Sequence, residues 1–150
     1  MSKPMVEAEL IIKIPFHDLD PLEIVWHGNY IKYFEMVRAE LLDIIDYNYE
    51  RMRESGYMWP IIEAKLRYIK PATYGQKIKI CARLTEYEYR MKIDYIIYDL
   101  ESGKRLTKGH TIQVAIDMKT EQLCLASPDV FLHKLKITTT DNSVRKNTRL

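Results

Sequence analysis

The amino-acid sequence predicts an α+β protein in which a five-stranded antiparallel sheet wraps around one long helix. Three observations favour this fold class. Apolar residues recur with a helical period in one long segment, and they alternate with polar residues in five others. The last three alternating segments are joined by turns that suit hairpins and are too short for parallel crossovers. The length of 150 residues fits a single domain around one core.

The first predicted strand covers residues 7–16, because Leu10, Ile12 and Ile14 occupy alternate positions. The segment that follows, residues 17–29, crowds acidic residues, a proline and two histidines together ahead of any helix. A loop that only reverses the chain does not need so many acidic residues and histidines. We therefore expect this loop to carry function.

The helix begins after this loop. From Tyr30, apolar side chains recur at Phe34, Val37, Leu41 and Ile44, a spacing that draws one stripe along a helix. Asn29 is the expected N-cap, and Gly56 is the expected stop. The sequence thus predicts a long helix with one buried face.

Four further strands follow the helix. The period changes to two after residue 60, and the predicted strands cover residues 62–68, 78–84, 91–98 and 107–116. Turn-like sequences at residues 86–89 and 101–104 separate the last three. A short terminal helix is expected after Pro128, where Val130, Phe131, Leu132 and Leu135 supply an apolar face.

The charges nearly balance, with 23 Lys and Arg against 21 Asp and Glu and a net charge of +2. Residues 134–150 hold five cations and one acid, which leaves a net charge of −2 on residues 1–133. We therefore expect a domain over residues 1–133 and a basic, flexible tail over residues 134–150. This balance predicts no basic face for nucleic acid.

Other classes of protein and site are also disfavoured. No apolar run approaches the ~18–20 residues of a membrane span, and the first residues lack the apolar core of a secretory signal. Cys81 and Cys124 stand far apart, with no clustered histidines that would complete a metal site. We expect a cytoplasmic protein with reduced thiols, no membrane partner, no metal and no cofactor.

The loop and the start of the helix resemble the hotdog-fold thioesterases, above all the 4-hydroxybenzoyl-CoA and YbgC-like acyl-CoA thioesterases. The resemblance is carried by Asp20-Pro21-Leu22-Glu23-Ile24-Val25-Trp26-His27-Gly28-Asn29-Tyr30, by Tyr33-Phe34-Glu35-Met36-Val37-Arg38, and by Tyr68-Ile69-Lys70-Pro71-Ala72 with Tyr74-Gly75. It covers about residues 8–131. It implies a hotdog fold that hydrolyses an acyl-CoA or acyl-carrier-protein thioester. It also implies a homodimer or homotetramer that joins sheets edge to edge and builds each site from both protomers.

In that family the aspartate that opens the pattern Asp-x-x-x-x-Val-x-His-x-Asn-Tyr is the catalytic carboxylate. The matching residue is Asp20, not Asp18. The match also makes His27 a catalytic candidate and assigns oxyanion or substrate-positioning roles to Gly28, Asn29 and Tyr30. The family usually has glycine three positions after the aspartate, where this chain has Glu23.

Elementary chemistry supports the same residues. Thioester hydrolysis needs a group that activates water or attacks the carbonyl, and donors that stabilise the oxyanion. Asp20 can act as general base or as nucleophile through a transient anhydride, and unpaired N–H groups at a helix entrance can bind the oxyanion. We favour the backbone N–H of His27 as the donor, with Gly28 nearby. The alternatives are a turn-forming role for Asp20 before Pro21 and an imidazole that acts through its side chain.

Two other functions remain open at this point. A non-catalytic acyl-CoA-binding protein would keep the fold without turnover, and a hotdog hydratase or dehydratase would need histidine patterns that this chain lacks. Lys70, Arg90 and Lys92 are candidates for contacts to the phosphates of CoA. Glu35 and Arg38 are expected to form an ion pair within one helical turn, and His17 and Asp18 to be surface groups.

Overall fold

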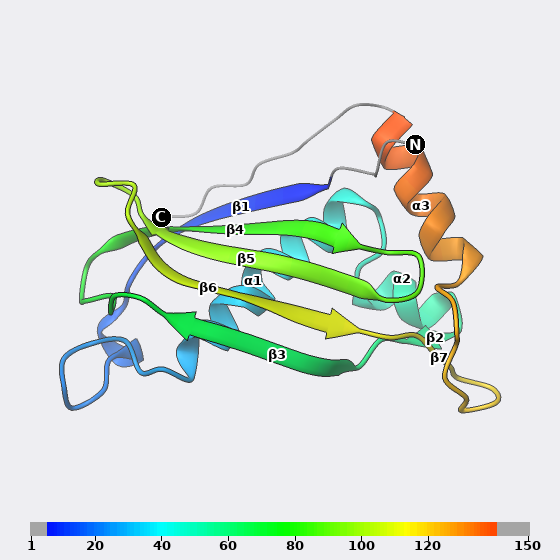
Figure 1. Cartoon of the computed structure of the whole chain (residues 1–150), viewed down its shortest axis with the longest axis horizontal. Helices are drawn as coiled ribbons and strands as arrows, with labels where there is room; N and C mark the ends of the chain where they lie inside the picture. The colour runs from blue at the N-terminus through cyan, green and yellow to red at the C-terminus, as the bar shows by residue number, and fades with distance from the viewer. Residues whose placement is uncertain (1–5, 141–150) are drawn as a thin grey trace.

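The computed structural model describes residues 6–140, and Figure 1 shows a curved sheet with one helix against its inner face. The helices are η1 (Phe16–Asp18, a 3-10 helix), α1 (Asn29–Ile44), α2 (Tyr49–Glu54) and α3 (Asp129–Thr140). The strands are β1 (Glu7–Lys13), β2 (Tyr57–Met58), β3 (Ile61–Tyr68), β4 (Lys77–Glu86), β5 (Met91–Asp99), β6 (Arg105–Gln113) and β7 (Ile116–Asp117).

The main sheet has five strands in the order β1-β4-β5-β6-β3, and every neighbouring pair is antiparallel. Tight hairpins join β4 to β5 and β5 to β6, as the short turns predict. The α+β class and the five-stranded antiparallel sheet are therefore confirmed. The order also leaves β1 and β3 at the two edges.

The apolar stripe of α1 forms the centre of the core. Phe34, Val37 and Leu41 are fully buried, and Ile44 is partly buried. The ring of Phe34 stacks on that of Tyr95 in β5, with ring centroids 4.2 Å apart. A Cβ at Gly109 of β6 would lie 2.9 Å from the Phe34 ring and closer still to backbone, so glycine is required for this close approach.

The first helix is shorter than expected. It ends at Ile44 rather than near Gly56, because Asp46 adopts the left-handed conformation with φ of 55°. The chain restarts as α2, whose N-cap Asn48 accepts a hydrogen bond from the N–H of Arg51 at 3.0 Å. Gly56, with φ of 87°, ends this second helix instead.

The last predicted strand is also divided. β6 stops at Gln113, and Ile116 belongs to β7, which pairs with β2 in a separate two-stranded sheet. The apolar alternation of residues 107–116 therefore runs through two strands that serve different sheets.

The terminal helix is longer than the short helix that the sequence predicts after Pro128. α3 runs from Asp129 to Thr140 and buries Phe131 and Leu135 against the core. Phe131 packs against Tyr47 and Trp59, with ring centroids 5.8 and 5.0 Å away. The domain boundary expected at residue 133 thus falls inside a helix, and residues 141–150 of the expected tail lie outside the described residues. None of the described helices is long and apolar enough to span a membrane.

Edge strand β3 is exposed along nearly its whole length. Within residues 6–140 it pairs with β6 alone, so its other edge presents backbone donors and acceptors. Ile61 and Ile62 add exposed apolar surface beside this edge.

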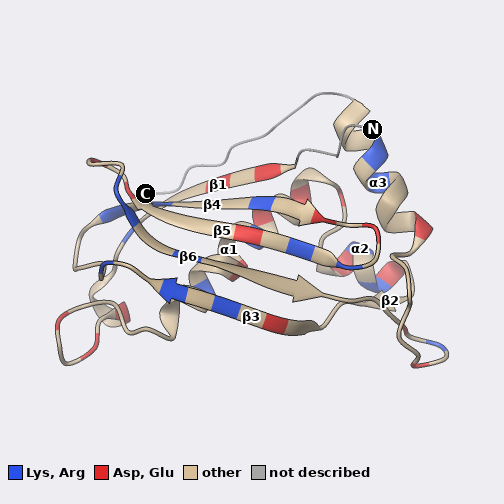
Figure 2. Ribbon diagram, viewed as in Figure 1, with Lys and Arg blue, Asp and Glu red and all other residues tan. Residues whose placement is uncertain are grey.

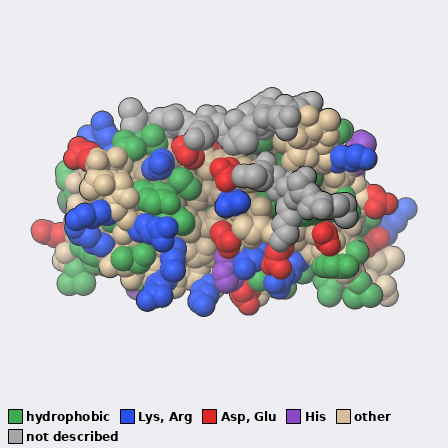
Figure 3. All heavy atoms as spheres, turned by 45° about the horizontal axis from the view of Figure 1, so that its top comes forward, with side chains coloured by type: hydrophobic (Ala, Val, Ile, Leu, Met, Phe, Trp, Pro, Cys, Tyr) green, Lys and Arg blue, Asp and Glu red, His purple; other side chains and the backbone are tan. Residues whose placement is uncertain are grey.

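Charges are unevenly spread over the sheet. One group of Lys and Arg lies toward the end beside the β1–α1 loop, on the left of Figure 2, and others lie toward the right on β4, β5, α2 and α3. The space-filling view shows the same grouping of basic side chains on the left of that face (Figure 3). The nearly balanced composition gave no indication of this grouping.

Candidate active site

The loop between β1 and α1 folds back on itself through short backbone hydrogen bonds. The N–H of Asp20 donates to the C=O of Ile24, and the N–H of Glu23 donates to the C=O of Asp20, both at 2.9 Å. The N–H of Val25 donates to the C=O of Ala72, also at 2.9 Å, and joins the loop to the segment after β3. Residues 20–25 therefore form a tight turn that is anchored to the body of the protein.

Glu23 lies at the tip of this turn with φ of 62°. This left-handed region favours glycine, which is the residue that the resemblance leads one to expect at this position. A side chain there costs roughly 1 kcal/mol of backbone strain. The turn nevertheless keeps its shape, since the Glu23 side chain is exposed.

Asp18 is buried, so the expectation that it is a surface group is wrong. Its Oδ1 accepts a hydrogen bond from the ammonium group of Lys32 at 2.7 Å, and its Oδ2 accepts one from the hydroxyl of Tyr33 at 2.6 Å. Its backbone carbonyl accepts from the N–H of Trp26 at 3.0 Å and from the side-chain amide of Asn29 at 2.8 Å. Asp18 therefore fastens the loop to the first turn of α1.

The pKa of Asp18 reflects these contacts. Burial by itself raises the pKa of the carboxyl group, but the hydrogen bonds from Lys32 and Tyr33 and the charge of Lys32 outweigh it. The net result is a pKa below the ordinary value for aspartate. An ionised carboxylate with both oxygens occupied is suited to holding structure together and poorly suited to accepting a proton.

Asp20 has a different environment. Its Oδ1 accepts one hydrogen bond, from the N–H of Leu22 at 2.8 Å, which is the Asx turn expected before Pro21. Its Oδ2 has no hydrogen-bonding partner within residues 6–140. The side chain of Asp20 can therefore stabilise the turn through Oδ1 and still offer Oδ2 to a substrate or a water molecule.

The entrance of α1 offers unpaired donors. The helix starts at Asn29, whose N–H donates to the C=O of Trp26 at 2.9 Å, and the N–H of Tyr30 donates to the C=O of His27 at 3.4 Å. The backbone N–H groups of His27 and Gly28 donate to no group in the described part of the chain. Such N–H groups at a helix start carry partial positive charge and suit a developing oxyanion.

Gly28, and not Asn29, occupies the N-cap position, with backbone angles already in the helical region. A Cβ on Gly28 would lie 2.3 Å from the indole ring of Trp26. Only glycine leaves room for that ring beside the backbone. This position therefore needs glycine for packing as well as for access to its N–H.

The other two positioning candidates contribute to the fold. The amide of Asn29 binds the backbone of Asp18, as described above, and the hydroxyl of Tyr30 accepts a hydrogen bond from the N–H of Ala72 at 3.2 Å. Tyr30 is buried, and burial raises the pKa of its phenol. Both residues hold the loop, the helix and the segment after β3 together around the site.

Tyr68, at the end of β3, makes a contact that the sequence gave no reason to expect. Its hydroxyl donates to the backbone carbonyl of His27 at 3.0 Å, and its ring meets that of Tyr30 edge-on, with centroids 5.2 Å apart. No spacing rule links residues so distant in sequence. Only the position of β3 beside the helix entrance brings them together.

A cavity of about 300 Å³ lies at this site, and of the predicted site residues Asp20, His27 and Tyr30 line it whereas Gly28 and Asn29 do not. It is lined by Asp20, Leu22, Ile24, Val25, His27, Tyr30, Tyr68, Ile69, Lys70 and Pro71. A largely apolar lining with a few convergent polar groups is the usual composition of a small-molecule site. The imidazole of His27 is exposed and contacts the rings of Trp26 and Tyr68, and it makes no hydrogen bond within the described residues.

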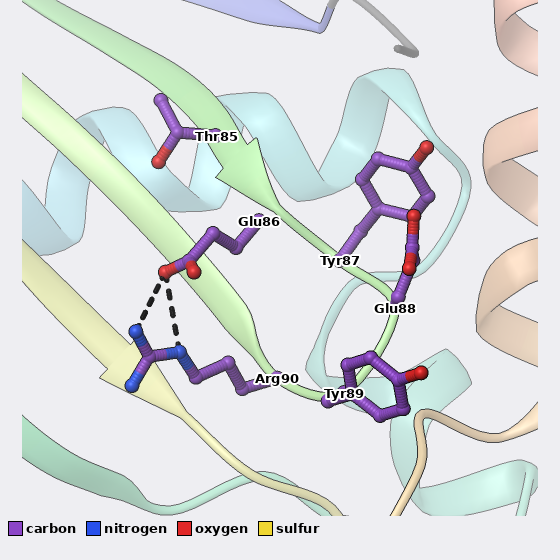
Figure 4. A pocket seen from close by; sticks show the side chains of 6 residues that line it. All are labelled: Thr85, Glu86, Tyr87, Glu88, Tyr89 and Arg90. Atoms are coloured by element: carbon purple, nitrogen blue, oxygen red, sulfur yellow. Dashed lines mark hydrogen bonds and ion pairs between the residues drawn. The ribbon is translucent and has the colours of Figure 1, made fainter. Parts of the chain in front are cut away.

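A second hollow, of about 190 Å³, lies at the β4–β5 hairpin, at the other end of the sheet. Figure 4 shows its side chains, in which Arg90 binds Glu86 at 2.9 and 3.2 Å. The positive charge of Arg90 is therefore balanced by the negative charge of Glu86. Among the cations considered for CoA phosphates, Arg90 is therefore occupied far from the cavity, while Lys70 lies in the cavity lining.

The ion pair that the sequence predicts between Glu35 and Arg38 lies outside the cavity. Arg38 and Glu35 form the expected pair within one helical turn at 3.0 Å, but Arg38 is also buried and donates to the hydroxyls of Tyr49 and Tyr95. Within residues 6–140, no group of three or more His, Cys, Asp or Glu side chains is placed to hold a metal ion.

Comparisons with known proteins identify the family of this chain. The sequence profile of the thioesterase-like superfamily matches residues 14–135. The chain is 25% identical over 122 residues to the putative acyl-CoA thioesterase YneP of Bacillus subtilis, covering 79% of this chain and 88% of that protein. It is also 25% identical over 131 residues to the chloroplastic acyl-acyl carrier protein thioesterase ATL3 of Arabidopsis thaliana, covering 85% of this chain and 69% of that protein.

A solved structure shows the same fold. The DHNA-CoA thioesterase of Staphylococcus aureus superposes with a TM-score of 0.75 at 22% identity, covering 94% of this chain and 98% of that one. The profile match extends over most of the chain, including the loop, the helix and the whole sheet. The chain therefore belongs to the thioesterase-like superfamily of hotdog-fold thioester hydrolases.

Proposed function

We propose that this protein hydrolyses an acyl thioester with Asp20 as the general base or nucleophile and the backbone N–H groups of His27 and Gly28 as oxyanion donors. The observation that carries the proposal is a cavity lined by both Asp20, a carboxylate with one open oxygen, and His27, whose backbone N–H donates to no group within residues 6–140. Family membership supplies the reaction class, and the contacts of each residue support its role.

Each group has a step to perform. The open oxygen of Asp20 takes a proton from water as the water attacks the thioester carbonyl, or it attacks that carbonyl itself. Negative charge then develops on the carbonyl oxygen, where the N–H groups at the start of α1 stabilise it. When water is the nucleophile, collapse of the intermediate breaks the carbon–sulfur bond, the thiolate leaves with the proton that Asp20 took, and the free acid is released. When Asp20 is the nucleophile, collapse releases the thiolate, which takes a proton from solvent, and leaves an anhydride on Asp20 that a water molecule then hydrolyses to the free acid and the Asp20 carboxylate.

The choice between Asp20 and Asp18 follows from their environments. Both oxygens of Asp18 are occupied by Lys32 and Tyr33, whereas Asp20 lines the cavity with one oxygen open. A base must be free to accept a proton from its substrate. Asp18 supports the site as its anchor.

We further propose that the active form is at least a dimer. The open edge of β3 carries exposed backbone groups and apolar side chains, and Tyr68 and Ile69 at its end line the cavity. A second copy paired along this edge would extend the sheet and cover the cavity with its own residues. The carrier of the acyl group is acyl-CoA for YneP and acyl carrier protein for ATL3, as their names state, and we propose the same two classes for this chain.

A thiol-release assay tests the proposal. Purified protein is incubated with acyl-CoAs of aromatic, short and long chains and with a thiol-reactive dye, and turnover of at least one of them is expected. Asp20→Asn is the test variant, with Glu23→Gln in the same turn as its matched control. Turnover by Asp20→Asn at the rate of wild type would refute the catalytic assignment, and tight acyl-CoA binding without any release would indicate a binding protein.

A further inference from the structure

We propose that the outer face of the sheet, at its active-site end, is a docking surface for an acidic acyl carrier protein. This inference rests on the proposed thioesterase function and names the carrier of its substrate. The surface, which we call the cationic face, comprises Lys65, Arg67, Lys77, Lys79, Arg105 and Lys108. These residues come from β3, β4 and β6.

The first argument is that these charges are not neutralised. No acidic side chain within residues 6–140 forms an ion pair with any of the six. Lys79 instead lies over the ring of Tyr98, 5.2 Å from its centroid. Asp94 of β5 lines the same hollow as Lys65, Arg67, Arg105 and Lys108, but it forms no ion pair with them.

The second argument comes from strand register. Arg67 of β3 stands directly opposite Lys108 of β6, and Lys13 of β1 stands directly opposite Lys77 of β4. Like charges directly opposite each other destabilise a sheet. Two such pairs at the same end of one sheet form an arrangement that folding alone disfavours and that an anionic partner would relieve.

The opposite end of the same face shows the contrast. There Glu7 faces Arg83 in the register and pairs with it at 3.5 Å, and Glu63 binds His110 at 2.6 Å. These two ion pairs therefore lie toward the end away from the active site, and neither includes a residue of the cationic face. Figure 2 shows the acidic positions of β1 and β3 toward the right and the basic positions of β3 toward the left, with further basic positions toward the right on β4 and β5.

The cationic face adjoins the catalytic cavity. Arg67 precedes Tyr68, whose hydroxyl holds the helix entrance and whose ring lines the cavity. A hollow of about 460 Å³ lies on the outer face and includes Lys65, Arg67, Arg105 and Lys108 in its lining. A carrier bound on this surface would hold its acyl arm near the cavity mouth.

The size of the surface favours a protein over a small anion. The cations extend from β3 to β4 in the sheet, across three spacings of about 4.8 Å each, or roughly 14 Å. A helix with side chains is about 10–12 Å wide, so one acidic helix fits across this face. Acyl carrier proteins are small, strongly acidic and helical, and such charge complementarity speeds and orients association.

Charge-reversal variants test the docking surface. Arg105→Glu/Lys108→Glu on β6 and Lys77→Glu/Lys79→Glu on β4 change two strands independently, and Lys119→Glu/Lys136→Glu changes the net charge equally at the opposite end of the molecule. The value of kcat/KM is measured with one acyl chain on a bacterial acyl carrier protein, on CoA and on pantetheine. We expect each cationic-face variant to lose about tenfold or more on the acyl carrier protein, with pantetheine turnover and the control variant unchanged.

Salt provides a second readout. For wild type, kcat/KM on the acyl carrier protein should fall steeply between about 0.02 and 0.3 M salt, and this dependence should flatten in the cationic-face variants. Absence of turnover on all three substrates would refute the thioesterase function itself. Normal turnover of the acyl carrier protein by both cationic-face variants would refute docking alone.

Two other results would assign the face to a different ligand. Equal losses on acyl-CoA and on the acyl carrier protein, with pantetheine unaffected, would mean that it binds the phosphates of CoA. Binding of a short DNA duplex that the same variants abolish, measured by fluorescence anisotropy, would mean that it binds nucleic acid. Either result would overturn the docking proposal.

Discussion

The hydroxyl of Tyr68 donates a 3.0 Å hydrogen bond to the backbone carbonyl of His27. That carbonyl belongs to the same planar peptide unit as the N–H of Gly28. Tyr68 therefore fixes the direction of a proposed oxyanion donor, and by polarising the peptide it strengthens that N–H as a donor. The edge strand is thus coupled to the chemistry at the start of α1.

Tyr68→Phe should lower kcat about three- to tenfold with little change in KM, because the Gly28 N–H remains but loses its fixed orientation. The edge-on contact with Tyr30 is retained by phenylalanine. Steady-state kinetics check this result against Tyr74→Phe, an exposed tyrosine that packs on Phe16 outside the cavity. An equal loss in the two variants would show that the hydroxyl of Tyr68 has no particular role.

Asp20→Asn should lower kcat by roughly 10²–10⁴-fold and leave the fold intact, because an amide neither accepts a proton from water nor attacks a thioester. Asp18→Asn should instead lower the free energy of unfolding by about 1–3 kcal/mol, since Lys32 and Tyr33 lose a charged buried acceptor. Kinetics and urea denaturation of both variants separate the two effects. A stable but inactive Asp18→Asn, together with an active Asp20→Asn, would reverse the assignment.

The depressed pKa of Asp18 predicts a pH dependence of stability. Its pKa in the folded state lies below the ordinary value of 3.8, so the ionised form is bound more favourably in the folded protein. The resulting stabilisation is fully present above that ordinary pKa and is lost as the pH falls through the lower, folded-state value. Urea titrations of wild type and Asp18→Asn should therefore differ most near neutral pH and converge in strong acid. A constant difference across this range would contradict the linkage.

His27→Ala should reduce kcat/KM only modestly, about tenfold, because the backbone N–H remains when the side chain is removed. The imidazole makes no hydrogen bond within the described residues, so no carboxylate orients it for proton transfer. The kcat/KM of wild type and variant is measured against pH, with circular dichroism confirming the fold. A loss approaching that of Asp20→Asn, together with a pH dependence of wild-type kcat/KM that the variant lacks, would show that the side chain acts as acid or base.

Glu23→Gly should raise the free energy of unfolding by about 0.5–1 kcal/mol, because glycine adopts the left-handed backbone without the strain that a Cβ introduces. Glu50→Gly, in the first turn of α2, is the matched control and should lower it by a similar amount. Denaturant unfolding of both variants gives the comparison. A loss of stability in Glu23→Gly would mean that the carboxylate makes a contribution larger than the strain.

Local pattern was sufficient for much of the fold, and it predicted the loop in which the candidate site lies. Alternation identified the five strands of the main sheet, and the stripe through Phe34, Val37 and Leu41 identified the buried face of α1. These features depend on residues close together in sequence, where periodicity directly reports which side chains share a face. The same pattern failed at Asp46, because a single left-handed residue can end a helix without changing the apolar period.

By itself, then, the sequence determined the class of fold, and its resemblance to a known family pointed to the loop of residues 17–29 as the candidate site and to Asp20 as its candidate carboxylate. The tertiary structure alone decided that Asp18 is the buried anchor, that Tyr68 holds the peptide of His27 and that Arg67 faces Lys108. Each of these contacts joins residues that are distant along the chain. These contacts depend on strand order, register and burial, which arise from the packing of the whole domain. Because packing between distant segments produces no periodic pattern in the sequence, the contacts cannot be predicted from the sequence alone.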